Sequence, residues 1–110
     1  MWVEFDIFSG RPNPSWKMSF EEVVEVRSRL GPMIKTEKPP DEGGLGYRGF
    51  VISNSEKIPG IPIEIRVYKA ILTVNENRST SYYTDVNDIE TLLIDQARKR
   101  GYEDLVSAIT

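Results

Sequence analysis

Residues 9–16 read Ser9-Gly10-Arg11-Pro12-Asn13-Pro14-Ser15-Trp16 and connect a predicted strand to a predicted helix. Gly10 tolerates backbone angles that other residues resist, and each proline fixes its own φ and pushes the preceding residue toward extended geometry. We therefore expect a stiff loop, here called the proline loop, around which the chain is organised. Its spacing matches no catalytic or phosphate-binding motif of known mechanism.

Two interpretations of the proline loop are open. As a binding surface, it would hold Arg11, Asn13 and Trp16 in a fixed orientation, which suits recognition of an anion, an amide or a flat ring. As a structural corner, it would use Arg11 to bond backbone carbonyls, Asn13 in an Asx-turn and Trp16 to close one end of the core. Tyr47 and Arg48 are further candidate contact residues, because aromatic and arginine side chains anchor many interfaces.

The stretch from Trp2 to Phe8, before the loop, alternates in polarity. Val3 and Phe5 share one face, and this period of two predicts a half-buried strand. Glu4 and Asp6 share the other face and lie about 7 Å apart by strand geometry. This pair could bind a cation or a basic partner, or it could face water, as charged residues on an open sheet commonly do.

The first helix begins at a capping box, Ser19-Phe20-Glu21-Glu22, and ends at Gly31-Pro32. Helical spacing predicts a buried stripe, with Val26 lying off it. The expected stripe residues are Phe20, Val23, Val24 and Leu30.

The second helix is predicted over residues 88–100, with Asn87 or Asp85 as its cap and Gly101 at its end. Its expected buried residues are Ile89, Leu92, Leu93 and Ala97. The tail at 105–109 is apolar enough to dock, either as a helical turn or as a strand.

Residues 31–46 contain four glycines and three prolines and show no periodicity, so we predict a flexible loop there. Strands are expected at 47–53, 61–74 and 80–84. Within the first of these, we expect Gly49 to mark a bulge or the close approach of another backbone or of a ligand. In the second, Ile61, Ile63, Ile65 and Val67 are expected to point inward, but the apolar phase then flips. A bulge near Lys69 or a change of strand must lie there.

These elements predict a single α+β domain spanning residues 1–110. We expect a two-layer sandwich, in which an antiparallel or mixed sheet of about four to five strands carries two helices on one face. If the tail is a strand, the order approaches the βαββαβ arrangement of ferredoxin-like folds.

The composition excludes several chemistries. The chain has no cysteine and no histidine, so thiol nucleophiles, imidazole bases and the common zinc sites are ruled out. We predict no cofactor and no metal site; a metal would need oxygen ligands alone. The net charge of −3 gives no reason to expect a nucleic acid as partner. An acidic start and the lack of an apolar run of about 20 residues predict a cytoplasmic protein without a membrane span.

We favour a small non-enzymatic binding or protein-interaction module that uses the proline loop as its contact surface. The expected partner is a protein or a small molecule, whose identity the sequence does not give. The candidate contact residues are Arg11, Asn13, Trp16, Tyr47 and Arg48.

Two alternatives remain. The first is a histidine-free enzyme in which Asp6 or Glu4 acts as base, Arg11 or Arg48 stabilises negative charge, and Tyr82 or Tyr83 acts as acid. The second is a self-assembling subunit, such as a homodimer, because residues 61–74 are long, apolar and β-prone and could pair through an exposed edge.

Overall fold

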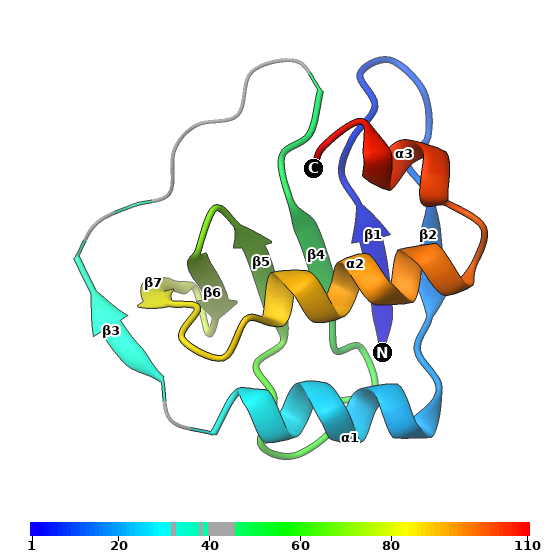
Figure 1. Cartoon of the computed structure of the whole chain (residues 1–110). Coiled ribbons are helices and arrows are strands. Elements are labelled where there is room, and N and C mark those ends of the chain that lie inside the picture. Colours follow the sequence, from blue (N-terminus) through cyan, green and yellow to red (C-terminus); the bar gives the residue numbers. More distant parts are fainter. Residues whose placement is uncertain (32, 38, 40–45) are drawn as a thin grey trace.

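A computed structural model of the chain describes residues 1–31, 33–37, 39 and 46–110 (Figure 1). The strands are β1 (Trp2–Phe5), β2 (Ser15–Lys17), β3 (Ile34–Thr36), β4 (Phe50–Ser53), β5 (Glu64–Tyr68), β6 (Ile71–Glu76) and β7 (Ser79–Thr84). The helices are α1 (Phe20–Arg29), α2 (Ile89–Lys99) and α3 (Glu103–Ser107). None of the helices in these ranges combines the length and the apolar character that a membrane span requires.

The described strands form one antiparallel sheet in the order β2-β1-β4-β5-β6-β7-β3. The mixed α+β class is confirmed, but the prediction of four or five strands is wrong, because the sheet has seven. The two edge strands, β2 and β3, have only three residues each. A strand that short cannot display a period of two, so neither was recognised as a strand.

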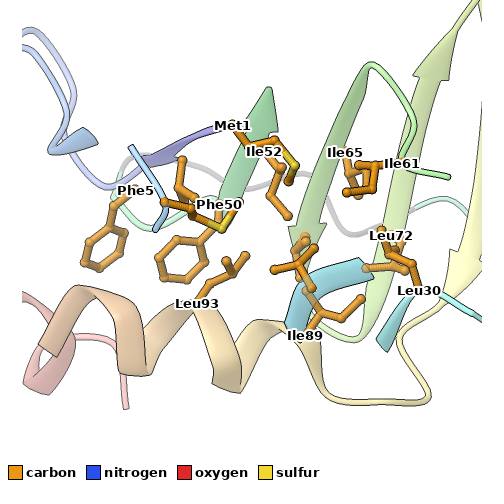
Figure 2. Close-up of a cluster of buried hydrophobic side chains, with 14 of the residues drawn as sticks. Met1, Phe5, Leu30, Phe50, Ile52, Ile61, Ile65, Leu72, Ile89 and Leu93 are labelled. Carbon is orange, nitrogen blue, oxygen red and sulfur yellow. The ribbon is translucent and has the colours of Figure 1, made fainter. Parts of the chain in front are cut away.

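The core lies between the sheet and the helices. Strand register places Phe5 beside Phe50, and Phe50 beside Val67, on one face of the sheet. Both α1 and α2 lie on the same side of the sheet (Figure 1). Figure 2 shows Ile89 and Leu93 reaching from α2 toward the strands, where both are fully buried. The opposite face of the central strands carries the alternate residues.

The phase flip near Lys69 is a change of strand. Lys69 and Ala70 both have positive φ, 47° and 67°, and form the two-residue turn between β5 and β6. Across this turn Val67 pairs with Leu72 and Ile65 pairs with Val74, so the apolar set continues on the core face of β6. Ile63 was expected to point inward, but it precedes β5 and its side chain is 42% exposed.

Helix α1 begins as predicted, but the side that it buries is not the expected stripe. The capping box is present: the Glu22 N–H donates to Ser19 Oγ, and the Ser19 N–H donates to Glu22 Oε1. Val26, which the pattern set apart, is fully buried, whereas Phe20 is 79% and Val24 49% exposed.

The buried side of α1 includes a charged residue. Glu22 lies at the interface with α2, where Arg100 Nη2 and Nη1 donate to its carboxylate at 2.6 and 2.9 Å. This hydrogen-bonded pair lowers the pKa of Glu22 to about 2. The buried row of α1 consists of Glu22, Val26 and Leu30, and the side that carries Phe20 faces outward.

Helix α2 is capped by Asp85, the second of the two predicted caps. The Asp85 carboxylate accepts hydrogen bonds from the N–H groups of Ile89 at 2.8 Å and Glu90 at 3.1 Å. The open question of the tail is answered by α3, a short helix, so the chain does not reach the ferredoxin-like strand order.

Part of the predicted loop at 31–46 is a strand. Residues 34–36 form β3 and pair with β7, so this part is not structureless. Residues 31, 33, 37, 39 and 46 are in no helix or strand, and residues 32, 38 and 40–45 of that prediction lie outside the described residues.

Gly49 provides the sharpest test of the packing next to β4. Its φ is +98°, and a Cβ at this position would lie 2.2 Å from the carbonyl oxygen of Val67. The predicted close approach of another backbone is thereby confirmed. Gly49→Ala should lower the free energy of unfolding by about 3 kcal/mol or more, measured by urea denaturation.

Gly10→Ala is the matched control, because Gly10 has φ +80° but nothing within 4 Å of its added Cβ. It should cost only about 1 kcal/mol. Equal losses for the two variants would contradict the described backbone approach.

Candidate functional site

The side chain of Asn13 closes the proline loop. Its Oδ1 accepts hydrogen bonds from the N–H groups of Ile7 at 3.0 Å and Phe8 at 2.7 Å. Its Nδ2 donates to Glu4 Oε2 at 2.8 Å and to Asp6 Oδ1 at 3.3 Å. Asn13 therefore uses both ends of its amide inside the protein, as the structural interpretation of the loop requires.

Asp6 lies at the centre of this region, with only 4% of its surface exposed. Arg48 Nη2 donates to its Oδ1 at 3.1 Å, and Arg66 Nη1 donates to its Oδ2 at 2.8 Å. Arg66 Nη1 also donates to the carbonyl oxygen of Arg48 at 3.1 Å. We call this group the Asp6 cluster; its members are Glu4, Asp6, Asn13, Arg48 and Arg66.

Backbone pairing continues past the end of β1 and fixes Asp6 in place. The Asp6 N–H donates to the carbonyl oxygen of Gly49 at 2.9 Å, and the Arg48 N–H donates to that of Asp6 at 2.8 Å. In the sheet, Glu4 pairs with Val51 and Val51 pairs with Arg66, so Glu4 and Arg66 lie on the same face two strands apart. This register explains why Arg66 reaches Asp6 from β5.

The charges of the cluster hold Asp6 ionised. Burial acts to raise the pKa of Asp6, but the hydrogen bonds and charges of Arg66 and Arg48 outweigh it, so the pKa falls below 3.8. At neutral pH the carboxylate is charged and in turn orients both guanidinium groups.

Both guanidinium groups also face solvent. The side chains of Arg48 and Arg66 are 45% and 38% exposed. Apart from the bonds given above, their N–H donors have no partner among the described residues. Arg11, which is exposed on the proline loop, lies over the ring of Phe8 at 3.6 Å from its centroid.

Trp16 is buried on the core side and is 5% exposed. Its Nε1 donates to Gln96 Oε1 of α2 at 3.0 Å, and its ring stacks on Tyr102 at 6.0 Å between centroids. Trp16 therefore anchors the end of the proline loop to the helical layer, and we leave it out of the binding surface.

Tyr47 also belongs to the core rather than to the Asp6 cluster. Its ring meets the rings of Phe5, Phe50 and Tyr68 edge-on. Its hydroxyl donates to a carboxylate oxygen of Glu90. Burial, and then this carboxylate, raise the pKa of Tyr47 well above its usual value of 10.0.

Of the five predicted contact residues, the structure brings Asn13 and Arg48 together around Asp6, with Arg11 on the same loop. Arg66 was missed as a site residue. Its outward position in the alternation of 61–68 was visible, but its neighbours depend on strand order, which one sequence does not give. No group of three or more acidic side chains in the described ranges is arranged to hold a metal ion.

Comparison of the chain with protein-family models, with curated proteins and with solved structures found no match.

Asp6→Asn should lower the free energy of unfolding by about 2 kcal/mol at pH 7, because two guanidinium groups lose their shared carboxylate. Since the folded pKa of Asp6 is depressed, its contribution is fully present above pH 3.8 and is lost as the pH falls below that value. The difference between parent and variant, measured by urea unfolding at pH 7 and pH 3, should therefore shrink at pH 3.

Glu4→Gln is the control. Glu4 is exposed, and the side-chain oxygen of the glutamine can still accept the hydrogen bond from Asn13. It should change stability by no more than about 0.5 kcal/mol. A loss for Glu4→Gln as large as that for Asp6→Asn would mean that Asp6 has no special role.

Proposed function

We propose that this chain is a small non-enzymatic binding module that takes an anionic group of its partner at Arg48 and Arg66. One observation carries the proposal: two half-exposed guanidinium groups are oriented by a single buried carboxylate, and their other N–H donors have no partner among the described residues. The anionic group is a carboxylate or a phosphate, presented by a protein or by a small molecule.

Preorganisation supports this choice. A guanidinium group binds a carboxylate or a phosphate through a planar fork, and less entropy is lost when the fork is already held in place. Asp6 holds Arg66 Nη1 at 2.8 Å and Arg48 Nη2 at 3.1 Å, so both side chains are constrained before any ligand arrives.

Local charge points the same way. Within the Asp6 cluster, two carboxylates balance two guanidinium groups, and Arg11 on the proline loop adds a further positive charge. This leaves a basic spot on a chain whose net charge is −3. The prolines stiffen the loop that carries Arg11, so a contact between Arg11 and the same partner would cost little entropy.

Acid–base catalysis fits the cluster less well. A general base works best with a pKa near the operating pH, whereas the pKa of Asp6 is lowered below 3.8 and its oxygens are occupied. Tyr82, a suggested acid, lies on β7, which β6 separates from β5 and Arg66. The strand edge suggested for self-assembly is absent, because β5 and β6 lie inside the sheet.

The test is a titration of the protein with inorganic phosphate, and separately with acetate, followed by ¹H–¹⁵N NMR at constant ionic strength. The Nε–Hε signals of Arg48 and Arg66 should shift saturably, together with the amides of residues 9–13. Arg66→Lys should raise the apparent Kd by about threefold or more, because lysine lacks the fork.

Arg78→Ala is the control, since Arg78 is exposed on the turn between β6 and β7. It should leave the Kd unchanged. Shifts no larger than those caused by sodium chloride, or shifts gathered at Arg78, would overturn the proposal. Whether acetate or phosphate saturates first separates carboxylate from phosphate recognition.

A further inference from the structure

A hollow of about 760 Å³ lies between α1 and α2, the two helices that lie on the same side of the sheet (Figure 1). The helices run antiparallel. Arg29, in the last turn of α1, donates to the carbonyl oxygens of Asn87 and Asp88, which directly precede α2. In the first turn of α1, Glu22 accepts from Arg100 with both carboxylate oxygens. Side-chain contacts therefore tie the helices together at both ends of the hollow.

Gln96 of α2 lines this hollow and keeps an unpaired donor group. The residue is only 1% exposed. Its Oε1 accepts from Trp16 Nε1 at 3.0 Å, whereas its Nε2 has no partner among the described residues. The oxygen and the nitrogen of an amide point apart, so with Oε1 turned to Trp16 in the core, Nε2 is turned to the hollow. Buried donors in native proteins are nearly always paired, so this amide calls for an acceptor.

Three carboxylates of the hollow keep oxygens that no described side chain uses. Glu21 has no hydrogen-bond or ion-pair partner among the described residues. Glu25 uses only Oε1, for Arg29 at 3.1 Å. Asp95 uses only Oδ1, for Arg98 at 3.4 Å. These oxygens are acceptors for a group that carries several N–H donors and a positive charge.

The two walls of the hollow differ in what they offer a ligand. The wall formed by α1 presents the carboxylates of Glu21 and Glu25. The wall formed by α2 presents Asp95 and also two donors one turn apart, Gln96 and Lys99. Lys99 is exposed and has no partner in the described part of the chain. A purely cationic ligand would leave Gln96 unpaired, and a purely anionic ligand would meet the carboxylates.

We propose that the hollow between α1 and α2 binds an α-ammonium group together with the carbonyl or carboxylate oxygen next to it. Free amino acids and the amino termini of peptides both present these groups. The oxygen accepts from Gln96 Nε2, and the ammonium group lies at Glu21 and Glu25. The half-buried Leu92 in the same lining provides a contact for an apolar side chain of the ligand.

Titration with L-leucinamide, and separately with L-leucine, tests the proposal by ¹H–¹⁵N NMR at constant ionic strength. The side-chain amide signals of Gln96 should shift saturably. The indole N–H signal of Trp16 should shift with them, because hydrogen bonds in a chain polarise one another. N-acetyl-leucine lacks the ammonium group and should leave both signals in place. Tighter binding of leucine assigns the site to a free amino acid, and tighter binding of leucinamide to a peptide amino terminus.

Glu21→Gln should raise the apparent Kd of leucinamide by about threefold or more, because it removes a charged acceptor of the ammonium group. Glu21 is exposed, so this variant should still fold. Glu76→Gln is the matched control, since Glu76 is an exposed glutamate at the end of β6. It should leave the Kd unchanged. Equal effects of the two variants would overturn the proposal, because binding would then follow net charge and not the hollow.

The absence of saturable shifts of Gln96 and Trp16 up to about 20 mM of either ligand would also overturn the proposal. Gln96 Nε2 would then be satisfied by water alone. The Asp6 cluster lies on the other face of the sheet, because Arg66 alternates with the core residues Ile65 and Val67. This inference is therefore independent of the proposed anion site, and either one can fail without the other.

Discussion

A carboxylate that is buried at the end of a sheet must be compensated, since an unpaired buried charge costs several kcal/mol. Asp6 is compensated by Arg48 and Arg66, and the Asn13 amide adds a third donor. The proline loop, the residues before β4 and strand β5 therefore meet at one side chain. The same constraint turns the outer sides of two guanidinium groups toward solvent, so the group that completes the fold also builds the site.

Local signals in the sequence were sufficient for much of the fold. The capping box at Ser19 was predicted, and so was a bulge or a change of strand near Lys69, because each depends on neighbouring residues only. The side that α1 buries could not be predicted, because it includes Glu22, whose partner Arg100 lies 78 positions away. With Glu22, Val26 and Leu30 on the buried side, Phe20 faces outward.

In the candidate site, too, some features follow from local sequence signals and others from long-range contacts. The types of Arg11, Asn13 and Arg48 marked them as contact residues, but only strand order brings Arg66 to Asp6. Trp16 looked equally suited to a surface, yet Gln96, 80 positions later, supplies a buried acceptor for its indole N–H. Residue type therefore indicated which groups could bind, whereas tertiary partners decided which of them remain free to do so.

The claim that Asp6 holds the two guanidinium groups is tested most directly by the pKa of Asp6 in the folded protein. This pKa can be followed through the side-chain carboxyl ¹³C resonance in an NMR pH titration. Pairing with Arg48 and Arg66 predicts a value clearly below 3.8. A value at or above 3.8 would mean that burial outweighs the arginines and that the two guanidinium groups are not held by Asp6. The basis for a preorganised anion site would then be lost.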